Sequence, residues 1–278
     1  MIFHRKFALF VLVSSSSLNL NPSALAQGSL TPPGAPAPLF KTLSEVEPRY
    51  PLFTYQTNLT VPGSYYLITN IFSGTNQNDA ITIRTNMSNI TIDLNGFSLI
   101  STNPANGASP AGVRISEATN IVVRNGQIWG FDRGVRAEGL FYGVVVENVH
   151  VHNTRRAGLE ADGTGNATQT VTFRNCVVES VDGTGEGASV SCDGIVVLNC
   201  TGVVQNCVVR DITAVGSGAS SCINAFSPTN TFVDGCFLSN ADVGIKVTGT
   251  ATRVFYRNNL TSGCTTPFSG GTDRGGNF

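Results

Sequence analysis

A short β-branched segment that ends at an asparagine recurs along this chain and limits the folds available to it. The segment first occurs at residues 90–99 as ITIDLNGFSL, and its last recurrence is VFYRNNL at residues 254–260. Seven such segments reach an Asn or a Gly at the same place in the pattern, at Asn95, Asn125, Asn148, Asn175, Asn206, Gly235 and Asn258. The intervals between these residues are 30, 23, 27, 31, 29 and 23 residues. A repeat of this length is one supersecondary unit, which buries its apolar face only by stacking on its neighbours.

The repeating unit is built from strands and not from helices. Apolar residues alternate with polar ones inside each unit, and Gly, Asn, Asp and Ser fill the segments between units. A period of two with Val, Ile, Thr and Phe is typical of strands, whereas a helical repeat needs a period of 3.6 over a longer run. A second strand, usually opened by glycine, precedes each asparagine strand, as in GVRI at 112–115 and GIKV at 244–247. Short strands wound repeatedly in this way predict an all-β parallel β-helix with coils about 4.8 Å apart.

The paired units GVRI…NIVVRNG and GLEA…VTFRNC resemble the repeats of right-handed parallel β-helix proteins in the pectate-lyase-like superfamily. Residues 42–100 look like the front end of a group of secreted bacterial β-helix proteins, and the similarity covers residues 42–269. The resemblance implies a single-stranded right-handed β-helix, a solenoid of about eight coils. It implies much less about activity, because that superfamily includes lyases, hydrolases, epimerases, phage tailspikes and proteins with no assigned chemistry.

The N-terminal residues predict export. Residues 1–26 carry HRK, an apolar run at 7–13, and Ala-Leu-Ala at 24–26, which together are typical of a secretory signal peptide. The apolar run is far too short to span about 30 Å of hydrocarbon. We therefore expect a secreted protein, whether extracellular, periplasmic or at the cell surface, with no membrane span.

The remaining chain divides by composition. Residues 27–40 are rich in Pro and predict a linker, and residues 41–57 predict an N-terminal cap segment with one helical turn at 41–50. Residues 58–269 hold the repeats of the parallel β-helix, and the Gly-rich residues 270–278 predict a flexible tail. Seventeen Lys and Arg against 18 Asp and Glu leave no basic excess, so no nucleic-acid partner is expected.

The seven cysteines all follow residue 175. Cys176, Cys207 and Cys236 each hold the position after a bend, so we expect a row of stacked, buried thiols. The spacing of parallel coils is longer than the Cβ separation that a disulfide prefers. Cys192 and Cys222 begin neighbouring loops and are the better candidates for a disulfide. No Cys-x-x-Cys spacing occurs, so no structural zinc site is expected, and no cofactor is predicted.

The asparagines at the bends have a structural interpretation. We expect their side-chain amides to stack as a ladder, each bonding to the next coil and satisfying turn groups that would otherwise be buried without a partner.

The outward residues of the glycine-started strands predict a first candidate site. The aligned positions give one stripe that holds Arg114, Arg136, Glu160, Asn224 and Lys246, and a second that includes Glu138 and Asp162. Two carboxylates about 5 Å apart perturb each other's pKa and suit a retaining glycosidase, and Arg beside acids suits uronate binding. The candidate catalytic residues are Glu138, Glu160, Asp162 and Arg136, and the candidate substrate-binding residues here are Arg114, Asn224 and Lys246. The alternative is a solvated face on which charges pair across strands.

A second outward stripe follows the bends and contains Trp129, His152, Glu179, Arg210 and Ser239, with His150 alongside. Trp129 beside polar groups could stack a sugar ring, so Trp129, His152 and Glu179 are further candidate substrate-binding residues. His-x-His with Glu179 also suits a metal, but the ligand count is low and no metal site is predicted.

The residues leave three functions open. The Asn-Thr-Asp, Asp-Asp and Gly-His-Gly groups of polygalacturonase-like hydrolases are absent, as is the Trp-x-Asp-His signature of pectate lyases. The leading hypothesis is therefore a secreted protein that binds a polysaccharide or another extended polymer along its flank. The second is a polysaccharide lyase or glycoside hydrolase that uses the acidic residues above. The third is a non-catalytic structural surface module.

Overall fold

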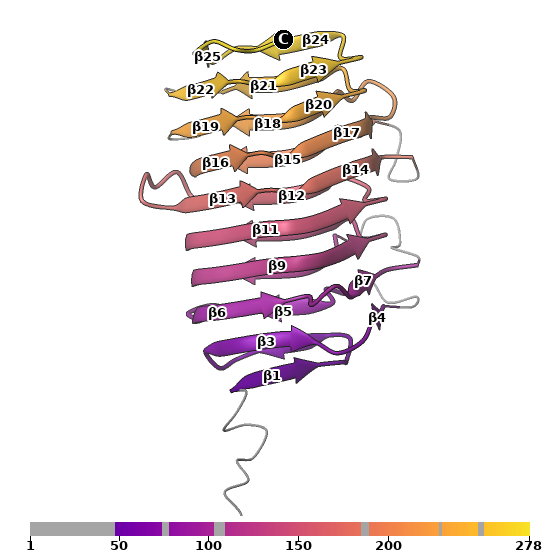
Figure 1. Cartoon of the computed structure of the whole chain (residues 1–278), viewed down its shortest axis with the longest axis vertical. Coiled ribbons are helices and arrows are strands. Elements are labelled where there is room, and N and C mark those ends of the chain that lie inside the picture. The colour runs from indigo at the N-terminus through magenta and orange to yellow at the C-terminus, as the bar shows by residue number, and fades with distance from the viewer. Residues whose placement is uncertain (1–47, 74–77, 103–108, 185–188, 228–229, 250–252) are drawn as a thin grey trace, which may run out of the picture. The chain divides into compact units, whose positions relative to one another are not determined.

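The computed structural model describes residues 48–73, 78–102, 109–184, 189–227, 230–249 and 253–278. These ranges consist of strands, turns and bends and contain no helix, so no helix within them could cross a membrane. The strands form two sheets that wind as one parallel β-solenoid, which confirms the predicted fold (Figure 1). The predicted signal peptide and the Pro-rich linker lie outside the described residues.

The smaller sheet, called sheet B, has nine strands and carries the glycine-started segments. In spatial order its strands are β2 (Thr57–Leu59), β5 (Ile81–Ile83), β8 (Ala111–Ser116), β10 (Arg133–Glu138), β12 (Ala157–Asp162), β15 (Cys192–Leu198), β18 (Ser220–Phe226), β21 (Val243–Thr248) and β24 (Thr266–Ser269).

The larger sheet, called sheet A, has sixteen strands and carries the asparagine segments. Its main row is β1 (Arg49–Leu52), β3 (Gly63–Leu67), β6 (Ser88–Asp93), β9 (Thr119–Trp129), β11 (Tyr142–His152), β13 (Thr170–Arg174), β16 (Thr201–Gln205), β19 (Thr231–Asp234), β22 (Val254–Arg257) and β25 (Thr272–Asp273). A second row beyond the bends is formed by β4 (Ile71–Phe72), β7 (Ser98–Ile100), β14 (Val177–Asp182), β17 (Val208–Thr213), β20 (Phe237–Ser239) and β23 (Leu260–Ser262).

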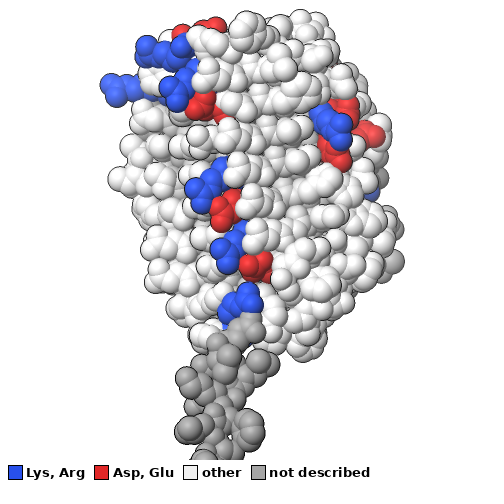
Figure 2. Space-filling view, in the orientation of Figure 1, with Lys and Arg blue, Asp and Glu red and all other residues white. Residues whose placement is uncertain are grey.

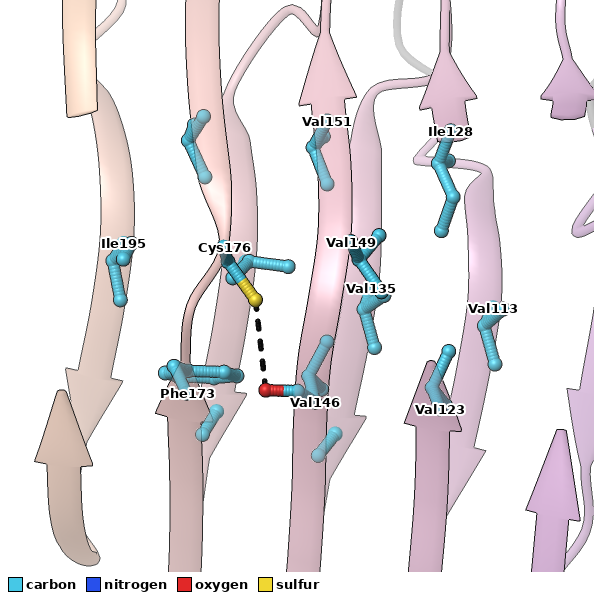
Figure 3. Packing of buried hydrophobic residues seen from close by; sticks show 14 of the residues in the cluster. Val113, Val123, Ile128, Val135, Val146, Val149, Val151, Phe173, Cys176 and Ile195 are labelled. Atoms are coloured by element: carbon cyan, nitrogen blue, oxygen red, sulfur yellow. Dashed lines mark hydrogen bonds between the residues drawn. The ribbon is translucent and has the colours of Figure 1, made fainter. Parts of the chain in front are cut away.

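The core lies between the two sheets and follows the predicted alternation. Val113, Val135 and Ile195 point inward from sheet B, and Val123 and Val146 face them from sheet A (Figure 3). All five side chains are 0 or 1% exposed. Burying an aliphatic side chain of this size contributes about 1.5–3 kcal/mol. One such layer per coil therefore supplies the stacking energy that a single coil lacks.

The bend residues share a left-handed backbone conformation. The six bend asparagines have φ between 51° and 59°, and Gly235 has φ 65°. Asn and Gly enter this region at lower cost than other residues. The predicted amide ladder is present only in part, since Asn148 Nδ2 donates to Asn125 Oδ1 at 3.4 Å whereas Asn258 Nδ2 donates to the Asp234 carboxylate. The conformation of the bend, more than a ladder, accounts for the repeated asparagine.

The glycines that open the strands of sheet B are required by space. A Cβ added at Gly134 would lie 2.4 Å from Val151 Cγ1 and 2.5 Å from the Gly158 carbonyl oxygen. Gly158 and Gly194 face the inner side of sheet A in the same way. At these positions sheet B approaches sheet A so closely that only glycine fits without a shift of its neighbours.

The expected row of thiols is confirmed, and the expected disulfide is not. Each thiol of the row donates to a carbonyl of the preceding coil, as Cys176 Sγ does to Val146 O at 3.5 Å (Figure 3). All seven cysteines belong to the described residues, and all are free. The proposed Cys192–Cys222 pair was wrong because Cys192 pairs in register with Ser220, while Cys222 occupies the position of Gly194 and Gly244.

The ends of the solenoid differ from expectation. Arg49 and Tyr50, expected in a helical turn, belong to strand β1, which pairs with β3. Residues 41–47 of the expected cap lie outside the described ranges. The C-terminal segment does not stand free of the last coil, because it forms β25, and the Phe278 carbonyl accepts a bond from Thr261 N at 2.6 Å.

The bend conformation predicts a contrast between two substitutions at Asn175, which has φ 53°. We expect Asn175→Val to lower the free energy of unfolding by about 1–2 kcal/mol because a β-branched residue is strained there. Asn175→Gly should change it by less than about 0.5 kcal/mol. Urea denaturation measures both, and an equal loss in the two variants would show that the amide and not the conformation is needed.

Candidate functional site

The outward residues of sheet B form one column across consecutive strands. In register, the column contains Asn58, Thr82, Arg114, Arg136, Glu160, Val196, Asn224 and Lys246. The six steps from Asn58 on β2 to Asn224 on β18 cover about 29 Å at the ordinary strand spacing. The repeat had predicted this alignment from Arg114 to Lys246, and the structure extends it by two strands toward the N-terminus.

Two hollows open along this column. The first, called the amide hollow, has a volume of about 620 Å³ and is lined by Gln56, Asn58, Asn78, Asp79, Thr82, Ser109, Pro110 and Arg114. The second, called the charged hollow, has a volume of about 370 Å³ and is lined by Arg133, Arg136, Arg156, Ala157, Glu160, Asp162, Ser191, Asp193, Val196, Leu198, Asn224 and Phe226. Arg114 of the first hollow pairs in register with Arg136 of the second. The two hollows therefore adjoin along the column, and together they are called the sheet B groove.

Ion pairs tie together the predicted catalytic residues. The nitrogen–oxygen distances are Arg114–Asp79 2.7 Å, Arg114–Glu138 2.9 Å, Arg136–Glu138 3.1 Å, Arg136–Glu160 3.0 Å, Arg133–Glu160 2.5 Å and Arg136–Asp162 4.0 Å. Glu138 and Glu160 each contact two arginines, whereas Asp162 has only the longest contact. The four predicted residues thus do lie together, as a network in which Asp162 is the least constrained carboxyl group.

Glu138 and Asp162 are neighbours in register, and their pKa values shift in opposite directions. Burial alone would raise the pKa of Glu138, but the hydrogen bond from Arg114 and the charges of Arg114 and Arg136 lower it. The pKa of Asp162 is raised, first by burial and then by the charge of Glu160. Neighbouring carboxyl groups whose pKa values diverge in this way can divide into an ionised partner and a proton donor.

A third acidic residue, Asp193, lines the charged hollow together with Glu160 and Asp162. Asn224 Nδ2 donates to Asp193 Oδ2 at 2.9 Å, and burial raises the pKa of Asp193. Asp193 Oδ1 and Asn224 Oδ1 are buried without a hydrogen-bond partner among the described residues. A buried acceptor without a donor costs about 1–3 kcal/mol, so both oxygens are places where a donor group would be stabilising.

The sequence reasoning missed Arg133, Asp193, Asp79 and Arg156 as groove residues. Counting back by two from the inward Val135 would place Arg133 inside. The alternation is interrupted at Gly134, because Gly134 and Val135 are both buried, and Arg133 contacts Glu160. Asp193 precedes Gly194 in the same way. The recurring glycine was a signal for this interruption. Asp79 and Arg156 lie in the segments before β5 and β12, where the alternation gives no information.

The second predicted stripe lies on sheet A, away from the groove. The Trp129 and His152 rings are stacked with centroids 5.8 Å apart, and the other neighbour of Trp129 in register is the buried Ile100. His152 therefore lies against one face of the indole, so the predicted stacking of a sugar on Trp129 would have to use the other face.

Glu179 of that stripe is held by its neighbours. His150 Nε2 lies 2.8 Å from Glu179 Oε1, and Arg210 Nε donates to Glu179 Oε2 at 2.7 Å. Burial raises the pKa of Glu179, but these two partners outweigh it and lower it. No group of three or more His, Cys, Asp or Glu within the described ranges is placed to hold a metal ion.

Sheet A also carries a line of alternating charges (Figure 2). Arg124 Nε lies 3.1 Å from Asp93, and Arg174 Nε donates to Glu147 at 2.7 Å. These residues follow one another in register, acid against base. The charges of this line neutralise one another within a single column, so it serves as a comparison surface for the groove.

Comparison with known proteins identifies the fold. The family model described as "Right handed beta helix region" matches residues 55–201. No curated protein matches the chain. Among solved structures, the chain is similar to ORF18 of Geobacillus virus E2, with a TM-score of 0.56 and 14% identity over 82% of this chain and 52% of that one. The chain thus spans about half the length of that protein.

Two further solved structures are more distant. One is tailspike protein 2 of Escherichia coli O157:H7 bacteriophage CAB120, with a TM-score of 0.38 and 15% identity over 74% of this chain and 34% of that one. The other is the catalytic unit of a thermostable GH87 alpha-1,3-glucanase from Streptomyces thermodiastaticus strain HF3-3, with a TM-score of 0.28 and 14% identity over 83% of this chain and 62% of that one.

The ion pairs predict that Glu138→Gln destabilises the protein near neutral pH. We expect a loss of about 2 kcal/mol in the free energy of unfolding, because Arg114 and Arg136 lose a partly buried carboxylate. A lowered pKa in the folded state stabilises above the unfolded pKa, and this stabilisation is lost as the pH falls through the folded value. Urea denaturation at neutral and acid pH should therefore show a difference that disappears in acid. The control is Glu147→Gln on sheet A, where the arginine partner Arg174 is 49% exposed, and we expect a loss of about 0.5 kcal/mol.

Asp162→Asn should have the opposite sign near neutral pH. A raised pKa in the folded state means that the ionised carboxylate is disfavoured by folding, so stability is lost as the pH rises through that pKa. The amide removes this effect, and we expect a slightly higher midpoint of thermal unfolding at neutral pH and no gain in acid. A lower midpoint at neutral pH would mean that the contact with Arg136 outweighs the burial of Asp162.

Proposed function

The chain belongs to the family of proteins with a right-handed β-helix region, and on this basis we propose that it is a secreted protein that binds a polysaccharide. The observation that carries the proposal is the single column that lines both hollows in succession over about 29 Å. A groove of this length suits an extended polymer better than a small molecule, which pockets enclose on most sides.

The chemistry of the groove lining supports a sugar ligand. Amide side chains such as Asn58 and Asn78 and the hydroxyl group of Thr82 can both donate to and accept from sugar hydroxyls. Phe226 in the charged hollow is 44% exposed and offers an apolar surface for the carbon face of a ring. The chain has no basic excess, which argues against a nucleic acid in the same groove.

If one polysaccharide chain occupies the whole groove, residues in both hollows should contribute to its affinity. Asn58 and Asn224 line the two different hollows, and Asn58→Ala and Asn224→Ala should each weaken binding of a long polysaccharide by about 5–30-fold through lost hydrogen bonds. Affinity electrophoresis against neutral and acidic polysaccharides measures this effect. The control is Gln205→Ala, an exposed amide on sheet A, which should change nothing.

The outcomes of this experiment separate the hypotheses. Binding that depends on one end only would contradict an extended ligand. No binding to any polysaccharide would contradict the proposed function and would favour a structural surface module. Thermal unfolding of each variant shows whether a loss of binding reflects a loss of fold.

A catalytic role is the second candidate, and the divergent pKa values of Glu138 and Asp162 favour it. Asp162 would donate a proton to a leaving oxygen, while Glu138 stays ionised beside it. The geometry supports binding better, because Glu138 and Glu160 are each held by two arginines. Reducing-sugar and unsaturated-uronide assays on acidic polysaccharides, with Glu138→Gln, Glu160→Gln and Asp162→Asn, test the role. Turnover that survives in all three variants would exclude these residues as the catalytic groups.

A further inference from the structure

The two hollows of the sheet B groove differ in chemistry. Among the described residues that line the amide hollow, Asp79 and Arg114 alone are charged, and they pair with each other at 2.7 Å. The rest of that lining is amide, hydroxyl and proline. This hollow therefore offers hydrogen bonds for neutral hydroxyl and amide groups and no free charge for an anion.

Three arginines line the charged hollow within the described part of the chain, and two of them form ion pairs. Arg133 and Arg136 contact Glu160, and Arg136 also contacts Glu138. Arg156 lines the same hollow, yet the described residues supply no carboxylate within ion-pair distance of its guanidinium. An unpaired guanidinium beside a partly apolar floor is a suitable partner for a carboxylate or another planar anion.

The same hollow also contains acceptors that lack donors. The unpartnered oxygens are Asp193 Oδ1 and Asn224 Oδ1, both buried in its wall. Burial raises the pKa of Asp193, whose carboxyl group lines the hollow together with Glu160 and Asp162. A ligand unit that carries one anionic group together with hydroxyl or amide N–H donors would satisfy both Arg156 and these oxygens.

The two hollows lie at a set distance from each other. Arg114 in the amide hollow and Val196 in the charged hollow are separated by three steps of the register. Three steps correspond to about 14 Å. We propose that the groove binds an acidic heteropolysaccharide, with a neutral sugar in the amide hollow and an anionic sugar beside Arg156. This inference rests on the proposed function and narrows it to one class of polymer.

Titration calorimetry of the full chain with three six-sugar probes tests the inference. The probes are a hyaluronan hexasaccharide, in which acidic and neutral units alternate, hexagalacturonate, which is acidic throughout, and chitohexaose, which is neutral throughout. We expect the hyaluronan fragment to bind at least about tenfold more tightly than either of the others. Its affinity should fall as salt is added, because one charged contact is screened.

Single-residue variants test which hollow contributes to the affinity for each probe. Arg156→Gln should reduce the affinity for the hyaluronan fragment to that for chitohexaose, and it should leave chitohexaose binding unchanged. Asn58→Ala should weaken the hyaluronan fragment and chitohexaose alike. The matched control is Arg174→Gln on sheet A, which should affect none of the probes.

The failure of this inference differs from the failure of the proposed function. The inference that the ligand is an acidic heteropolysaccharide would be overturned by equal affinity for the hyaluronan fragment and chitohexaose. It would also be overturned if Arg156→Gln left the affinity for the hyaluronan fragment unchanged. In both cases the proposal that the groove binds a polysaccharide would stand. The inference is also overturned if hexagalacturonate binds as tightly as the alternating probe. If none of the probes binds and no polysaccharide is retained in affinity electrophoresis, the proposed function fails and this inference fails with it.

Discussion

Parallel stacking of the coils at a constant spacing is the constraint on which the rest of the structure depends. Backbone hydrogen bonds between coils, such as Asn175 N to Gln205 O at 3.0 Å, fix which residue lies above which. Once that register is set, residues 23 to 31 positions apart in the sequence become neighbours about 4.8 Å apart. Every surface of the solenoid is therefore a set of columns, and its chemistry is decided by which residue types fall in the same column.

Stacking places like charges close together unless the sequence prevents it. Arg114 and Arg136 are adjacent in register on sheet B. Two unit charges at that spacing repel by about 3 kcal/mol at an effective dielectric constant near 20. Asp79 and Glu138 from outside this column, and Glu160 from the next strand within it, offset this repulsion. The resulting network is partly buried and tightly paired, so the groove walls are held in place before any ligand arrives.

On sheet A, repulsion between like charges is avoided within a single column. Asp93, Arg124, Glu147 and Arg174 alternate in sign along the axis, and each arginine lies against the acid of the preceding coil (Figure 2). That surface needs no charge from a second column. On sheet B, Asp79 and Glu138 pair with the arginines from outside the column, and Arg156 and Asp193 line the hollow beside it.

The repeat in the sequence was enough to predict the parallel β-helix, the inward residues such as Val113 and Ile195, the row of thiols, and the column from Arg114 to Lys246. These features follow from a period of two within a strand and a recurring bend, which are local properties of the chain. Arg133 and Asp193 could not be assigned to the groove in that way, because the alternation is interrupted at the following glycine. Asp79 and Arg156 lie in connecting segments, where no period exists. The sequence by itself therefore determined the coil and its columns. Only the tertiary structure decided which further side chains line the groove beside the column, because that depends on how closely the two sheets approach and where the connecting segments return.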